Sequence, residues 1–385
     1  GGGPGWYKLR QPVSRSRSTA PPTVPSPTSA GPARLAYTLG LSTAVLAFSL
    51  LPRVRASRGL LFAVWVAAGV LLVWQAVLAL RDRERGLAGF VAVPPRPQHY
   101  IQMCCHLGGY SYWGYYWAPV YPYLPLLALQ VAFAYAFDML LAWTRRRPFG
   151  MGFGPIPIVF STNLFLWFRD DWFALQFLLI ATGFLGKAFL QWERDGRRTH
   201  IFNPSAFALA LFSLVLIVTG QTGITWAQEI NTTFGLGPHI YLVLFLIGLV
   251  VMFFFSTTYV TASAAVTLFA GSALYHAVTG VPYFIDTEIP SAVFLGLHLL
   301  VTDPATAPRT PLGRVVFGVL YGAGVFGLYA LLGAVGVPTF YDKLLCVPLL
   351  NLLVPSIDRL VQTIGDRGWI AALGLAPPLG HRNLV

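Results

Sequence analysis

The chain has 385 residues, of which 56% are hydrophobic and only 10% are charged, and its mean hydropathy is +0.63. Soluble domains carry roughly 25% charged residues, so this composition excludes an ordinary soluble protein and predicts an integral membrane protein. The net charge of +12 does not indicate nucleic-acid binding, because the basic residues form short clusters between apolar runs. Three cysteines, Cys104, Cys105 and Cys346, have no metal-ligand spacing, so we expect neither a metal site nor a structural disulfide.

The chain begins with a segment, residues 1–34, that is rich in proline, serine, glycine and arginine and has no acidic residue. Such a composition cannot bury enough apolar surface to fold, so it predicts a flexible basic tail. Residues 35–97 are expected to contain two transmembrane helices and a linker.

Membrane spans are predicted where long apolar runs occur, because a bilayer core about 30 Å thick needs about 20 helical residues. An aromatic and glycine-rich segment, residues 99–117, is either a further span or an interfacial belt. The eleven clear runs are 35–52, 59–80, 121–143, 150–168, 171–191, 203–220, 237–255, 257–277, 287–301, 314–336 and 341–360.

Charge placement favours the further span at 99–117. With it, 21 of the 26 Lys and Arg residues fall on one face, which the positive-inside rule makes cytoplasmic. The exceptions are Arg53, Arg55, Arg58, Arg169 and Lys343. The sequence therefore predicts an all-α polytopic membrane protein of about twelve transmembrane helices, with both termini cytoplasmic.

The first candidate site is the polar start of a helix in "RRTHIFNPSAF". Asn203 can cap this helix and Pro204 suits its first position, so the amides of Ser205 and the next residue are expected to be unpaired. With Arg197 and Arg198 upstream, such an end suits a phosphate, including that of flavin mononucleotide. The alternative is an ordinary helix cap beside arginines that only set the topology.

The second candidate site is "VTDPATAPRTPLGR", where Thr302 and Asp303 precede three prolines that must end the helix. Asp303 either binds a ring system or a cation, or caps the next turn. Because both proline-marked boundaries fall on one face, we expect a cavity between them. Lys187 either extends to the interface or faces this cavity, and Asp138 should pair or line a path.

Motifs of soluble enzymes are absent from the sequence. It contains no GxSxG, no HExxH, no phosphate-binding loop, and no GxGxxG between a strand and a helix. The histidines are scattered and form no HxxxH pair. The aromatic cluster from Tyr110 to Tyr123 either packs at the interface or stacks on a planar cofactor. Catalytic residues therefore stay unknown.

Four motifs, "GKAFL", "FNPSAF", "TDPATAPRTPLGRVVFG" and "PLLNLLVPSIDRL", resemble those of RnfD, a membrane component of the Rnf electron-transport complex. They also resemble those of its relative NqrB, from the sodium-pumping NADH:quinone reductase. The resemblance covers residues 98–365 and is strongest to divergent members encoded in enediyne-biosynthesis clusters. It implies a ten-helix core that binds flavin and passes electrons within a multi-subunit complex of the bacterial inner membrane. Residues 366–385 then form a C-terminal tail.

One departure from the family concerns the flavin. Family members attach flavin mononucleotide through a threonine in a Ser-Gly-Ala-Thr-like motif, which neither residues 219–238 nor residues 256–269 contain. We therefore expect flavin mononucleotide or riboflavin to be held non-covalently, and acidic residues are too few to carry over ion pumping. Three functions remain open: an electron-transport subunit with no catalytic activity alone, a non-redox assembly subunit, and a small-molecule or ion transporter.

Overall fold

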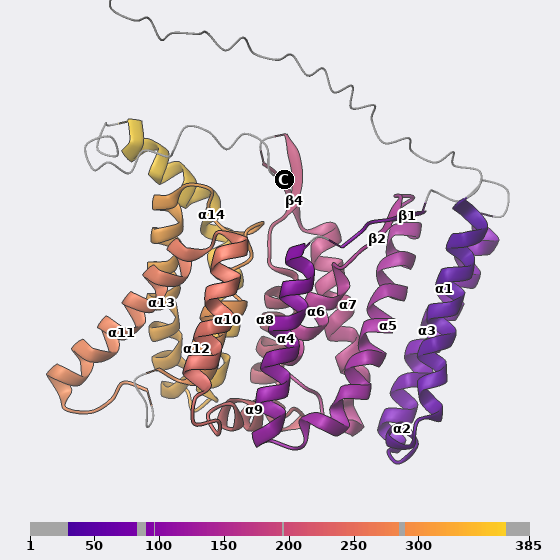
Figure 1. The fold of residues 1–385 in the computed structure, drawn as a ribbon, viewed down its shortest axis with the longest axis horizontal. Helices are drawn as coiled ribbons and strands as arrows, with labels where there is room; N and C mark the ends of the chain where they lie inside the picture. Colours follow the sequence, from indigo (N-terminus) through magenta and orange to yellow (C-terminus); the bar gives the residue numbers. More distant parts are fainter. Residues whose placement is uncertain (1–29, 83–89, 96, 195, 285–288, 367–385) are drawn as a thin grey trace, which may run out of the picture.

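The structure is a computed structural model that describes residues 30–82, 90–95, 97–194, 196–284 and 289–366. Most of the predicted N-terminal tail and nearly all of the predicted C-terminal tail lie outside these residues. The described part is predominantly helical, and Figure 1 shows most helices running between the same two faces. The helices are α1 (Ala30–Ala47), α2 (Pro52–Arg55), α3 (Arg58–Arg81), α4 (Pro97–Tyr116), α5 (Val120–Thr144), α6 (Pro155–Asn163), α7 (Ala174–Phe189), α8 (Pro204–Val218), α9 (Ala227–Phe234), α10 (Ile240–Phe255), α11 (Thr258–Thr279), α12 (Ser291–Leu299), α13 (Pro311–Ala334) and α14 (Asp342–Asp366).

Two small sheets accompany the helices. Strand β1 (Phe90–Ala92) pairs in parallel with β2 (Phe149–Met151), and β3 (Gln191–Arg194) pairs antiparallel with β4 (Arg197–His200). We call the side of the molecule that carries the β3–β4 hairpin the hairpin face; α2 and α9 lie at the opposite face (Figure 1). The hairpin is fixed to the helices by Arg194, which pairs with Asp358 of α14 at 2.6 Å and donates to the carbonyl of Ala307.

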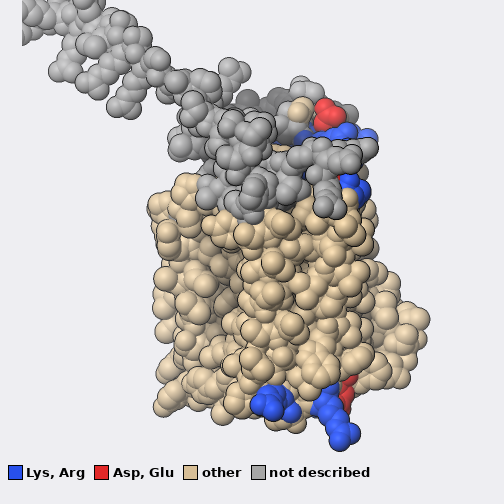
Figure 2. Space-filling view, turned by 90° about the vertical axis from the view of Figure 1, so that its right-hand side faces the viewer, with Lys and Arg blue, Asp and Glu red and all other residues tan. Residues whose placement is uncertain are grey.

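The helix content confirms an all-α polytopic membrane protein. Five helices are long and apolar enough to span a membrane: α3, α5, α11, α13 and α14, and four shorter apolar helices are α1, α7, α8 and α10. Together with α4, α6 and α12, they make twelve helical elements between the two faces in the described residues. On the side that Figure 2 shows, charged residues lie at the two ends of the molecule with an uncharged band between them.

Helix α4 covers the segment whose status the sequence left open, and it crosses the molecule. At its start, His99 stacks on Phe153, which follows β2 at the hairpin face. Near its end, the Trp113 indole donates to Thr233 of α9 at the opposite face. The segment therefore runs between the faces and does not lie flat.

Two of the predicted spans, 150–168 and 287–301, do not form full-length helices. Their helical parts, α6 and α12, have nine residues each, and non-helical chain follows both. They run in opposite directions. After α6 the chain reaches Asp170, which pairs with Arg53 of α2 at the opposite face, whereas after α12 it reaches Asp303, which contacts His200 of the hairpin.

The point where helix α6 ends and non-helical chain begins is enclosed by a buried network that we call the asparagine hub: Asn163, Gln130, Gln176 and Tyr123. Asn163 donates to the Gln130 carbonyl oxygen at 2.7 Å, and it accepts from Tyr123 at 3.0 Å and from Gln176 at 3.2 Å. Gln176 also accepts from the backbone amide of Phe168 at 3.0 Å. Non-helical backbone at membrane depth is tolerated where protein or a water-filled cavity surrounds it, and here the hub satisfies it.

Candidate functional site

A cavity of about 270 Å³ lies where the start of α8 meets the non-helical chain after α12. Its lining includes six of the eight residues proposed from the sequence: Lys187, Asn203, Pro204, Ser205, Thr302 and Asp303. The two proline-marked segments therefore lie on one face with a cavity between them. Residues about a hundred positions apart meet here because α8 begins near the hairpin face, where the 300–306 segment also lies.

The two arginines upstream are placed differently. Arg198 lies in β4 opposite Glu193, is exposed, and does not line the cavity. Arg197 is also in β4, but its side chain lies outside the described part of the structure. The hairpin thus directs Arg198 away from the cavity, and a phosphate there would lack the charge expected from it.

Asn203 caps α8, as the sequence predicts, and Pro204 occupies the first helical turn. The expectation of unpaired amides is wrong. The Asn203 side-chain oxygen accepts from the amides of Ser205 at 3.0 Å and Ala206 at 3.3 Å. Because the cap already uses these donors, the N-terminal end of α8 offers no free pair of amides to an anion.

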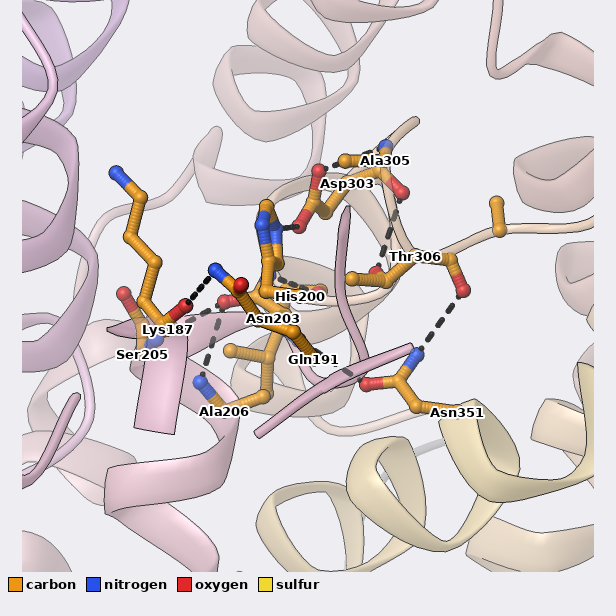
Figure 3. Close-up of polar contacts among 12 residues, drawn as sticks. Lys187, Gln191, His200, Asn203, Ser205, Ala206, Asp303, Ala305, Thr306 and Asn351 are labelled. Carbon is orange, nitrogen blue, oxygen red and sulfur yellow. Dashed lines mark hydrogen bonds and ion pairs between the residues drawn. The ribbon is translucent and has the colours of Figure 1, made fainter. Parts of the chain in front are cut away.

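The other polar atoms of Asn203 hold the chain after α12. Its side-chain nitrogen donates to the carbonyl of Leu300 at 3.0 Å, and its backbone amide donates to the Asn351 side chain at 3.2 Å. Asn351 of α14 in turn donates to the carbonyl of Thr306 at 3.3 Å. Asn203 and Asn351 therefore clamp both ends of the non-helical segment 300–306, as Figure 3 shows in part.

Asp303 and His200 face one another across the hairpin-side rim of the cavity (Figure 3). Their side chains approach to 3.4 Å, and the second Asp303 oxygen accepts from the Ala305 amide at 3.0 Å. Burial alone would raise the pKa of the Asp303 carboxyl. The hydrogen bonds and the charge of His200, with the Ala305 amide, outweigh burial, so this pKa lies below its ordinary value.

Lys187 of α7 is half-buried and lines the cavity. Figure 3 shows its side chain extending away from Asn203, and no described residue forms a hydrogen bond or ion pair with its amine. A side chain on Gly154 would lie 3.7 Å from this amine, so the glycine leaves room for it. The charge of Lys187 acts on the carboxyl of Asp138 in α5. The two ionisable residues that the sequence analysis singled out in these helices therefore lie close enough to interact electrostatically.

The sequence-based prediction missed the wall that α4 and α6 contribute. Gln102, Cys105 and His106 of α4 and Ser161 of α6 line the cavity, together with Val251 and Phe255 of α10. The polar residues of α4 within an otherwise membrane-spanning segment were the available signal, because polar groups in a span usually face the protein interior.

The aromatic cluster of α4 lies elsewhere. Trp117 stacks on Trp113 and on Trp167, Trp113 makes a tilted contact with Trp167, and Tyr123 also stacks on Trp167. These rings fill the space next to α9 at the opposite face, so they pack the core and do not line the cavity. Among the described residues, no group of three His, Cys, Asp or Glu side chains could hold a metal ion.

The chain is partly similar to a known protein. No protein-family model matches the chain. Over 99 residues the chain is 37% identical to the RnfD component of the ion-translocating oxidoreductase complex of Tolumonas auensis. The match covers 25% of this chain and 27% of that relative. The chain is therefore a multi-pass membrane protein that resembles RnfD over about a quarter of its length.

Proposed function

We propose that this chain is a membrane component of an electron-transport complex and that it holds a flavin non-covalently in the cavity between Asn203 and Asp303. The observation that carries the proposal is the cavity itself, which brings together six residues that the sequence alone predicts to form a site. The partial similarity to a component of an ion-translocating oxidoreductase supports the same class. The proposal also places the chain in the bacterial inner membrane, with both termini in the cytoplasm and with partner subunits bound to it.

The cavity fits the ring system of a flavin better than a whole nucleotide. Pockets that bury drug-sized ligands span about 300–1,000 Å³, and this cavity of about 270 Å³ lies just below that range. Apolar walls from Pro157, Val251 and Phe255 suit a planar ring, and the unpaired Lys187 amine suits the negative charge of a reduced ring. The capped α8 end is not available to a phosphate, so the flavin side chain would extend outside the cavity.

The visible absorption spectrum of the purified protein tests the proposal. We expect flavin bands in the native protein, and release of the flavin into solution on denaturation because no covalent attachment motif is present. The Lys187→Met variant should lose much of the bound flavin, whereas Arg198→Met, which removes a charge outside the cavity, should retain it. A wild-type protein that binds no flavin under any condition overturns the proposal and favours a non-redox assembly role.

One observation favours transport as a second candidate. Two short helices of opposite direction, α6 and α12, are each followed by non-helical chain, an arrangement found at the substrate sites of transporters. Uptake of a small solute into vesicles that contain the purified protein, with no flavin bound, would support this alternative.

A further inference from the structure

Three consecutive arginines follow α5 where it ends beside β2 at the hairpin face (Figure 1): Arg145, Arg146 and Arg147. The backbone holds them in a defined turn. The amide of Arg146 donates to the carbonyl of Trp143 at 2.9 Å, and the amide of Arg147 donates to the carbonyl of Ala142 at 3.0 Å. This pair of bonds is the Schellman arrangement that ends many helices. We call residues 145–147 the arginine turn.

Arg146 occupies a backbone conformation that favours glycine. Its φ is +54°, in the left-handed region, where a residue with a Cβ is strained. Glycine usually takes this position of a Schellman turn because it has no such strain. Strain that a simple replacement would remove points to a use for the side chain, and Arg146 is exposed.

The arginine turn lies at the level expected for lipid headgroups. Thr144, the last residue of α5, accepts from the indole of Trp74 in α3 at 3.0 Å. Tryptophan is enriched at this level because its ring is apolar and its N–H is polar. The Arg145 guanidinium lies 5.0 Å from the centroid of the Phe189 ring, at the end of α7. The turn thus meets the apolar surface at its boundary.

An apolar stripe on α7 leads to this boundary. Leu178, Leu185 and Phe189 are 53%, 39% and 60% exposed, whereas the other residues of α7 are buried or half-buried. Spacings of seven and four residues place the three side chains on one side of the helix. We call them the α7 stripe. In a membrane the stripe faces lipid, and Arg145 lies over its end.

The described acidic residues do not neutralise the arginine turn. Asp82 lies against the last turn of α5, but it is buried and paired with Arg81, which donates to its two oxygens at 2.9 and 3.0 Å. Within the described part of the chain, neither Arg145 nor Arg146 forms an ion pair. Burial and, after it, the charge of Arg147 lower the pKa of the Arg145 guanidinium. A bound anion would relieve this repulsion.

We propose that the arginine turn and the α7 stripe together bind one anionic phospholipid. Its phosphate lies on Arg145 and Arg146, and one acyl chain lies along the stripe. Guanidinium groups bind phosphate through charge-assisted and often bidentate hydrogen bonds. A lipid fits both parts of this surface, whereas a free phosphate uses only the arginines. The site is separate from the cavity and does not depend on a bound flavin.

Lipid binding to the purified full chain in detergent tests the proposal. Phosphatidylglycerol and phosphatidylcholine with identical acyl chains are titrated, and native mass spectrometry gives the Kd of the first bound lipid. An arginine near a membrane surface strengthens anionic-lipid binding about fivefold, so we expect at least about a tenfold preference for phosphatidylglycerol. Equal affinities overturn the proposal. Inorganic phosphate is titrated in parallel, and binding as tight as that of phosphatidylglycerol overturns the lipid as the occupant.

The variant Arg146→Gly separates the charge from the turn. Because glycine fits the left-handed position, we expect an unchanged or higher melting temperature together with about a fivefold weaker Kd for phosphatidylglycerol. The Kd for phosphatidylcholine should stay the same. A variant that keeps wild-type affinity for phosphatidylglycerol shows that Arg146 does not hold the phosphate and overturns the proposal.

The double variant Arg145→Gln with Arg146→Gln should lose the preference for phosphatidylglycerol. Its control is Arg359→Gln, which removes an exposed arginine of α14 and should bind both lipids as the wild type does. Equal losses in the double variant and the control indicate a general attraction of a basic protein for anions and contradict a specific site. Unchanged lipid binding in the double variant, with loss of a bound partner protein, identifies a protein interface and likewise overturns the proposal.

Discussion

The two short helices break in the same way but end in different surroundings. After α6, the non-helical chain enters the asparagine hub and the Trp167 ring stack, where side chains satisfy the backbone and fill the space. After α12, the non-helical segment 300–306 is clamped at both ends by Asn203 and Asn351, but its middle lines a cavity. A broken helix in a membrane therefore needs polar partners in either case, and whether a site forms depends on whether those partners surround the break or hold it only at its ends.

The helix break after α6, which side chains enclose, should be the more sensitive of the two to substitution. The largest effect on stability is expected for Asn163→Leu. Removing this side chain leaves Gln130, Gln176 and Tyr123 with unpaired buried polar atoms, each costing about 1–3 kcal/mol. We expect a loss of more than about 3 kcal/mol in the free energy of unfolding, measured by thermal or denaturant unfolding in detergent. Gln228→Leu, at an exposed position of α9, is the control and should change stability little. Wild-type stability of Asn163→Leu would show that the hub is dispensable.

A smaller effect is expected where α12 packs closely on α10. A side chain on Gly248 would lie 1.7 Å from Cδ2 of the buried His298 ring, so Gly248→Ala must displace that ring. Overpacking of this kind costs about 1–3 kcal/mol. The control is Gly109→Ala in α4, where the nearest atom lies 3.8 Å away. Equal melting temperatures for the two variants would contradict this close approach.

Asn203→Leu tests the clamp on segment 300–306 after α12. It removes a helix cap, worth about 1 kcal/mol, and the bond to Leu300, worth about the same. We expect the protein to remain folded, with the 300–306 segment loosened and ligand affinity reduced. Near-native melting with at least about a fivefold weaker Kd for riboflavin would support the clamp, whereas unchanged affinity would reduce Asn203 to a plain cap.

The smallest effect concerns pH and the His200–Asp303 contact. Because the pKa of Asp303 is lowered in the folded state, its contribution to stability is complete above the ordinary carboxyl pKa of about 3.9 and is lost as the pH falls through the lowered value. His200→Leu should raise this pKa and flatten the dependence of melting temperature on pH below about 4. A variant whose low-pH profile matches that of wild type would show that His200 does not influence the carboxyl.

Much of the membrane architecture follows from the sequence. Runs of about 20 apolar residues are required to cross a bilayer, and most predicted spans match helices to within a few residues, as 121–143 matches Val120–Thr144. The broken spans were not predictable in this way. Residues 150–168 and 287–301 are mostly apolar, and apolar composition does not distinguish a complete helix from a short helix followed by non-helical chain.

The candidate site, too, was only partly predictable from the sequence. By itself the sequence determined the local features: the Asn203 cap, because Asn before Pro suits a helix start, and the chain turn at Asp303, because proline cannot continue a helix. Only the tertiary structure decided what those features contact. Asn203 uses its donor on Leu300, 97 residues away, and Ser161 uses its hydrogen on His106, 55 residues away. Local sequence fixes which polar groups a segment carries, but hydrogen bonds between distant segments decide which donors and acceptors remain for a ligand.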